Sequence, residues 1–296
     1  MEDTHKPLFS FGVIADVQYG DKDDNHLEGR VQRYREAPQK LDKAVETFNA
    51  SKSSLLFVLT LGDIIDGNDT VERTSADFDI VLMSLSMLEL PTYHLLGNHC
   101  LTLPRERMLQ NLQMPDRFYY AELHPGWALV ILDTMDISVK WPVGSKNHEE
   151  AMTFMHNHPL GEANPQMSEW NGGLGSEQKT WLAHILSDAE RQGTHLIVAG
   201  HHPLVVGSAP STHLLWNHEE VAKMLVESPA VALFLNGHYH PGGYAQVGAK
   251  HFVTVEAILE APTGSFAHGI IHVYDKEIEI QGFSTVTSRV LSIPQY

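Results

Sequence analysis

The chain has 296 residues, of which 43% are apolar, so it can bury a large core in one or two domains and is too hydrophobic to remain disordered. Its 20 Lys and Arg against 37 Asp and Glu give a formal net charge of −17, which argues against nucleic-acid binding through a broad basic face. No apolar run approaches the roughly 18 residues of a membrane span, and we expect no secretory signal and no membrane partner. The single cysteine, Cys100, allows no internal disulfide, so the expected location is cytoplasmic.

Strands and helices alternate in the first part of the chain, which favours a parallel sheet. In chain order, the predicted elements are a strand at 8–15, a polar loop at 19–30, a helix at 37–48, a strand at 55–61, a helix at 73–90, a strand at 93–96, a small helix and a hairpin edge within 101–126, and a strand at 127–132.

Residues 137–175 lack periodicity and are expected to form a long loop insertion that contacts substrate. The later predicted elements are a helix at 176–191, a strand at 195–199, a loop at 204–216, a helix at 218–226, a strand at 230–235 and short strands at 243–247, 252–255, 269–274 and 277–283. The short final strands favour a second sheet. With no repeat or linker in the sequence, we expect residues 1–296 to form a single α/β domain of two facing sheets with helices outside.

Five predicted strands end in side chains that can bind a metal. Ligands of α/β proteins gather at the carboxyl ends of strands, so these side chains are expected to meet. Seven oxygen and nitrogen donors are too many for one tetrahedral ion and suit two ions that share a bridging carboxylate. The donors are Asp16 with Gln18, Asp63, Asn98, His201, and His238 with His240.

Four motifs between residues 9 and 240 resemble the calcineurin-like metallophosphoesterase superfamily. The motifs are Gly62-Asp63-x-x-Asp66-Gly67, Gly97-Asn98-His99, Gly200-His201-x-Pro203 and Gly237-His238-x-His240. The resemblance implies a four-layer α/β/β/α sandwich of two mixed sheets flanked by helices. It also implies a dinuclear centre in which a metal-bridging hydroxide attacks phosphorus.

The resemblance also implies a role for each motif residue. One set holds the first metal: Asp16, Gln18 and His240. Another set holds the second: Asn98, His201 and His238. Asp63 bridges the two ions, and His99 protonates the leaving oxygen or stabilises charge on the phosphoryl group. Asp66 would orient His99, although it could also cap the following helix.

The first motif departs from the usual Asp-x-His of the superfamily, because the chain has Asp16-Val17-Gln18. Gln18 either binds metal through its amide oxygen or only hydrogen-bonds a ligand. Asp-x-Gln is a feature of one branch, the manganese-dependent ADP-ribose/CDP-alcohol diphosphatases, to which Glu177-Gln-x-x-Trp-Leu and Leu214-x-Trp-Asn are also similar. An amide oxygen is a harder ligand than imidazole, which independently favours manganese or magnesium over zinc.

This branch implies hydrolysis of a small nucleotide at its pyrophosphate. ADP-ribose would give AMP and ribose 5-phosphate, and CDP-alcohols would give CMP and a phosphoalcohol. The alternatives are a phosphomonoesterase or protein phosphatase of the same fold, a nuclease, which the acidic balance disfavours, and a non-catalytic metal-binding scaffold. The expected cofactors are two divalent ions, manganese before magnesium, and we expect a monomer.

Other polar residues have weaker claims to function. Substrate contacts are expected from loops 19–35, 137–175 and 204–217, where arginines could bind phosphate or be helix-surface charges. We expect His202 to lie behind the ligands or on the surface, and Cys100 to be a buried structural thiol. The loop residues are Tyr19, Asn25, His26, Arg30, Arg33 and Arg35, and three further histidines, His148, His156 and His158, are expected to be solvated.

Overall fold

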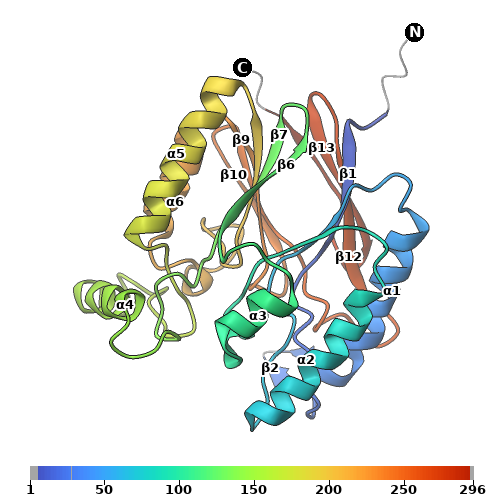
Figure 1. Cartoon of the computed structure of the whole chain (residues 1–296), viewed down its shortest axis with the longest axis vertical. Coiled ribbons are helices and arrows are strands. Elements are labelled where there is room, and N and C mark those ends of the chain that lie inside the picture. The colour runs from blue at the N-terminus through green and yellow to red at the C-terminus, as the bar shows by residue number, and fades with distance from the viewer. Residues whose placement is uncertain (1–5, 28, 294–296) are drawn as a thin grey trace.

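The computed structural model has the expected α/β/β/α architecture, in which two six-stranded mixed sheets face each other and helices cover their outer sides (Figure 1). It describes residues 6–27 and 29–293. Residue 28 of the expected substrate loop, and residues 1–5 and 294–296 of the expected domain, lie outside the described residues.

The first sheet joins strands from both ends of the described chain, in the order β14-β13-β12-β1-β4-β5. β1 lies inside this sheet, parallel to β4 and antiparallel to β12, and every residue of β1 is buried. The strands are β1 (Phe9–Ile14), β4 (Val58–Thr60), β5 (Thr92–His94), β12 (Ala267–Val273), β13 (Glu277–Ser284) and β14 (Arg289–Ser292).

The second sheet has the order β10-β11-β9-β8-β7-β6. Its four central strands, β7, β8, β9 and β11, run parallel to one another, and the edge strands β6 and β10 pair antiparallel with β7 and β11. The strands are β6 (Tyr119–His124), β7 (Trp127–Ile131), β8 (His195–Ala199), β9 (Val231–Asn236), β10 (Gly243–Val247) and β11 (Lys250–Thr254).

Two helices cover each outer face of the sandwich (Figure 1). α1 (Ala37–Ala50) and α2 (Val71–Ser86) pack on the first sheet, and α5 (Ser176–Gln192) and α6 (His218–Glu227) pack on the second. One apolar core lies between the sheets, and a second fills the space beneath α5 and α6. Among the helices described, none combines the length and the apolar character that a membrane crossing needs.

The expectation of an irregular segment throughout 137–175 is wrong, because α4 (Lys146–Asn157) forms within it. Ser145 caps this helix by accepting a hydrogen bond from the His148 amide. Only Ala151 of α4 is buried, so the helix has no apolar stripe that periodicity could reveal.

Smaller differences also come from packing. α2 ends at Ser86 rather than at residue 90, because the apolar residues after it reach the core from a turn instead of a helix. The polar loop after β1 contains a short exposed hairpin, β2 (Asn25–Leu27) with β3 (Arg30–Gln32). The small helix predicted within 101–126 is α3 (Arg105–Asn111), and β6 is the predicted hairpin edge.

A buried histidine at the end of β5 makes the fold sensitive to acid. Burial lowers the pKa of His94 to about 4, and its Nδ1 lies 2.8 Å from the Thr60 hydroxyl. In the unfolded chain the pKa is about 6.5. The native state therefore binds fewer protons, and this site's contribution to stability is lost as pH falls from about 6.5 to about 4.

We expect His94→Gln to make the loss of stability between pH 7 and pH 4.5 shallower by about 2–3 kcal/mol, because most of the interval between the two pKa values lies within this pH range. Urea unfolding of the metal-free protein at both pH values measures it. Parallel pH profiles for the two proteins would contradict the assignment.

Candidate metal centre

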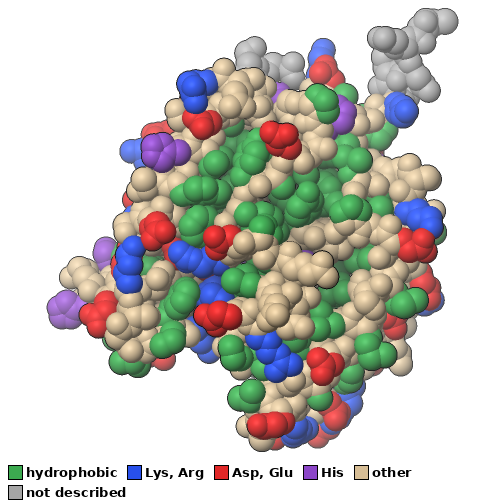
Figure 2. Space-filling model, viewed as in Figure 1, with side chains coloured by type: hydrophobic (Ala, Val, Ile, Leu, Met, Phe, Trp, Pro, Cys, Tyr) green, Lys and Arg blue, Asp and Glu red, His purple; other side chains and the backbone are tan. Residues whose placement is uncertain are grey.

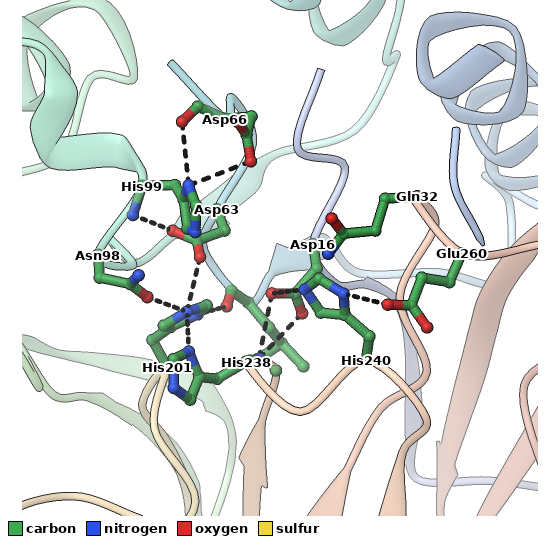
Figure 3. Close-up of polar contacts among 12 residues, drawn as sticks. Asp16, Gln32, Asp63, Asp66, Asn98, His99, His201, His238, His240 and Glu260 are labelled. Atoms are coloured by element: carbon green, nitrogen blue, oxygen red, sulfur yellow. Dashed lines mark hydrogen bonds and ion pairs between the residues drawn. The ribbon is translucent and has the colours of Figure 1, made fainter. Parts of the chain in front are cut away.

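The predicted ligands occupy loops that follow five strands and meet at one end of the sandwich (Figure 3). Asp16 and Gln18 follow β1, Asp63 follows β4, and Asn98 follows β5. His201 follows β8, and the pair His238 and His240 follows β9. Apart from His240, which is partly buried, these residues are buried, which is unusual for charged and strongly polar side chains without partners.

Backbone strain concentrates at these loops. Asp16, Gln18, Asp63 and His238 have φ of 47°, 41°, 44° and 69°. Non-glycine residues in this left-handed region cost free energy and collect at functional sites, where the surrounding structure holds them. These four strained residues all lie in the loops that carry the proposed ligands.

Two glycines permit the close approach of these loops. A Cβ on Gly97 would lie 2.2 Å from Asp63 Oδ1, and a Cβ on Gly237 would lie 2.3 Å from Asp16 Oδ2. Both contacts are impossible for any residue with a side chain. The glycines before Asn98 and His238 are therefore required by packing against the carboxylates.

The first group of ligand atoms centres on His201 Nε2. The Leu61 carbonyl, 2.8 Å away, accepts the proton of His201 Nδ1, so Nε2 presents a lone pair when the ring is neutral. Asp63 Oδ2 lies 3.0 Å from Nε2, and Asn98 Oδ1 lies 3.2 Å from it. Three electron-rich atoms thus converge on one point.

His238 adds a fourth atom to this group. Its Nε2 donates to Asn171 Oδ1 at 2.9 Å, because the Asn171 amide nitrogen already donates to two carbonyls. His238 Nδ1 therefore offers a lone pair, 3.2 Å from His201 Nε2. Such a set repels itself unless a proton or cation lies inside it, so its chemistry fits a divalent ion.

The second group contains Asp16 and His240, and Gln18 lies in the same loop as Asp16, where its backbone amide donates to the Asp63 carbonyl at 2.8 Å. His240 Nδ1 donates to Glu260 at 2.8 Å, which leaves Nε2 free, 3.8 Å from Asp16 Oδ1. Gln18 Oε1 is buried and has no hydrogen-bond partner among residues 6–27 and 29–293. An orphaned buried amide oxygen is what an absent cation would leave, so this group also fits a metal site.

Electrostatics link the two groups. Burial raises the pKa of Asp16 to about 6. Burial also opposes ionisation of Asp63, but the charges of His201 and His99 outweigh it and hold the pKa of Asp63 below its ordinary value. Burial lowers the pKa of His238 well below its usual range, which keeps this imidazole neutral and able to bind metal.

His99 and Asp66 pair at the rim of the centre, as expected. His99 Nδ1 lies 3.1 Å from Asp66 Oδ1 and 3.0 Å from the Asp66 carbonyl, while 37% of the His99 side chain is exposed (Figure 3). The helix-cap alternative for Asp66 is wrong, because Thr70 caps α2. Lys22 forms an ion pair with the other Asp66 oxygen. His99 therefore presents Nε2 to solvent with its ring direction fixed.

Of the other residues that the sequence singled out, some are buried near the centre and some are exposed at the end of α4. His202 is buried against the ring of His238, at 4.2 Å between centroids, and is not on the surface. Cys100 is a buried thiol, as predicted, and burial raises its pKa to about 12. His156 and His158 are exposed at the end of α4.

Among the described residues, three or more metal-binding side chains of the His, Cys, Asp and Glu types gather only at Asp63, His201 and His238.

Two of the three arginines in and just after the loop that follows β1 pair with carboxylates, and the third, Arg33, donates to the Val31 carbonyl at 3.1 Å. Arg35 forms exposed ion pairs with Asp21 and Asp23. Arg30 donates to both oxygens of Glu260 at 3.1 Å, and Glu260 in turn holds His240. Arg30 therefore holds Glu260, the partner of His240, and its guanidinium is already engaged by a carboxylate.

Three residues that contact the predicted site residues were not expected from the sequence. Glu260 contacts His240, Asn171 contacts His238, and Lys22 contacts Asp66. Glu260 lies beyond the last motif, and Asn171 lies in the long segment between α4 and α5. Each forms a hydrogen bond or ion pair with a residue far away in the sequence, so no local spacing of residues reveals it. The one available signal is Asn171-Gly-Gly, a turn-forming sequence that interrupts an otherwise featureless stretch.

Comparisons with known proteins agree with this geometry. The model of the calcineurin-like phosphoesterase family matches residues 9–242. The chain is 36% identical over 301 residues to the manganese-dependent ADP-ribose/CDP-alcohol diphosphatase of Arabidopsis thaliana, covering 96% of each chain. It is 30% identical to the protein of the same name from Homo sapiens, covering 99% of this chain and 95% of that one. A dimetal phosphatase from Danio rerio superimposes with a TM-score of 0.89 at 28% identity, covering 97% of this chain and 100% of that one.

Proposed function

This chain belongs to the calcineurin-like phosphoesterase family, and from that premise we propose that it hydrolyses the pyrophosphate of ADP-ribose and CDP-alcohols with two manganese ions. The carrying observation is the convergence of nitrogen and oxygen ligand atoms around His201 and around Asp16, in a chain similar over 96% of its length to an enzyme named for that activity. Magnesium suits the same oxygen-rich ligands and is the second candidate.

Each side chain has a defined part in this proposal. Asp63 would bridge the two ions, with Asn98, His201 and His238 holding one of them and Asp16, Gln18 and His240 holding the other. When bound, the divalent ions activate water as the nucleophile and offset phosphate charge. His99, held by Asp66, gives a proton to the leaving oxygen.

The charge balance explains how an acidic protein could bind a diphosphate. The net charge is −17, yet the proposed ligands include only two carboxylates, so two divalent ions leave the centre positive. On the face drawn in Figure 2, Lys and Arg side chains are interspersed with acidic ones rather than forming a broad basic track. A small substrate held at a metal centre fits this surface better than a nucleic-acid polymer.

A substrate comparison tests the proposal. With manganese, kcat/KM for ADP-ribose and a CDP-alcohol should exceed that for p-nitrophenyl phosphate by at least about tenfold, because only the conjugates gain binding energy beyond the reacting phosphate. AMP and CMP should be the nucleotide products. A higher kcat/KM for p-nitrophenyl phosphate or a phosphopeptide would instead favour the phosphomonoesterase or protein phosphatase alternative.

Gln18→His tests whether the amide oxygen is an inner-sphere ligand. Imidazole is a softer donor, so we expect the ratio of manganese-supported to zinc-supported activity to fall by about tenfold. Competition binding of the two ions gives the same comparison without turnover. An unchanged metal preference would mean that Gln18 only hydrogen-bonds a ligand.

We further propose that residues 1–296 act as a single domain, since the first sheet joins strands from both ends of the described chain, and that the protein is a monomer. Segments 19–35, 137–175 and 204–217 would contact the nucleotide. The sequence has one cysteine, which is buried, in keeping with the proposed cytoplasmic location.

A further inference from the structure

An aromatic group borders the metal centre on the His238 side. The indole of Trp170 lies 5.3 Å from the His238 ring, and the ring of His213 lies 5.6 Å from it. Tyr239 packs edge-on against His213 at 5.1 Å, and Trp170 packs edge-on against His213 at 5.0 Å. Trp170 is 38% exposed, so a large flat ring faces solvent one side chain away from a proposed ligand.

One buried side chain fixes this aromatic group relative to the centre. Asn171, which follows Trp170, accepts from His238 Nε2 at 2.9 Å and donates to the Thr212 carbonyl, next to His213, at 2.8 Å. It also donates to the Gln166 carbonyl at 2.8 Å, which closes the turn that carries Trp170. These bonds therefore fix the turn that carries Trp170 relative to His238, and a preorganised substrate contact needs such a fixed position.

We propose that Trp170, with His213 and Tyr239, forms the subsite on which the nucleobase of the substrate stacks. This inference rests on the proposed function and deepens it. Adenine and cytosine differ in size and in their hydrogen-bonding edges, so one edge-reading site would not serve both. Both have an aromatic face, and stacking tolerates any base.

The surroundings favour a base over a phosphate at this position. A neutral planar base meets no electrostatic penalty in a protein of net charge −17, whereas a second phosphate would. The site lies beside the ligands from β8 and β9, so a base stacked there leaves its phosphate within reach of the centre.

Product binding tests the subsite without requiring turnover. AMP and ribose 5-phosphate are both phosphorylated ribose, and AMP carries adenine in addition. In the manganese-loaded protein, Trp170→Ala should weaken AMP binding by about 10- to 100-fold in isothermal titration, the range expected for losing one base–aromatic stack. Binding of ribose 5-phosphate should change by less than about twofold, since no base is lost.

Two variants control for general damage. Trp170→Phe keeps a stacking face and should retain most of the AMP affinity. Tyr120→Ala removes an aromatic side chain of similar exposure, 37%, from the far edge strand β6 and should bind AMP as the parent protein does.

The subsite is overturned if Trp170→Ala binds AMP as tightly as the parent, or if it loses affinity for both ligands equally. If the parent protein binds AMP through Trp170 but does not cleave ADP-ribose, the subsite is supported and only the proposed function is contradicted. If Trp170→Ala cleaves ADP-ribose with an unchanged KM, the proposed function is supported and the subsite is contradicted.

Discussion

Replacing Asp63 by asparagine should lower kcat for ADP-ribose on the order of 1,000-fold. Asp63 is the carboxylate proposed to bridge the two groups of ligand atoms, and its Oδ2 lies 3.0 Å from His201 Nε2. Asparagine removes the negative charge that would bridge two cations. It keeps an oxygen that can accept from the His99 amide, now 2.8 Å from Oδ1, and it tolerates the positive φ at this position. The loss should therefore come from the centre and not from unfolding.

Metal content and thermal unfolding complete this test. The Asp63→Asn protein should bind fewer than two manganese ions per chain, while its fold remains cooperative. Asp188→Asn on the exposed face of α5 makes the same change in net charge far from the centre and should leave kcat and metal content unchanged. Near-normal turnover with two bound ions in Asp63→Asn would remove Asp63 from its proposed bridging role.

His99→Ala should lower kcat for ADP-ribose by about 100- to 10,000-fold, the usual contribution of a positioned general acid. The imidazole is not among the proposed ligands, and its Nδ1 is occupied by Asp66 at 3.1 Å. Metal content should therefore stay at the parent value. A substrate with a good leaving group, such as p-nitrophenyl phosphate, needs less protonation and should lose far less activity.

Asp66→Asn serves as the companion variant. It weakens the orientation of His99 without removing the ring, so its effect should be about 10- to 100-fold. Equal losses on both substrates in His99→Ala, or loss of a metal ion, would show that His99 supports the centre rather than protonating the leaving group.

The candidate ligands could be picked out from the sequence because each follows a buried strand. Strands such as β1 and β9 are continuous apolar runs, so the first polar residue after them is conspicuous. The parallel order of the central strands then brings these ends together. Two facing sheets with helices outside followed from the same alternation and from the short strands at the end, and the resemblance to the family implied the α/β/β/α sandwich.

The residues behind the ligands could not be found in this way. Glu260 and Asn171 act on His240 and His238 across 20 and 67 positions of sequence. Their positions depend on the packing of loops, which periodicity does not describe. α4 was missed for a related reason, because a helix that buries only Ala151 leaves no apolar pattern to detect.

A crystal grown with manganese and measured by anomalous scattering tests the central claim most directly. The account predicts two ions about 3.5–4 Å apart with Asp63 between them, His240 and Gln18 beside one, and His201 and His238 beside the other. A single ion among these side chains, or two ions without Asp63 between them, would contradict it.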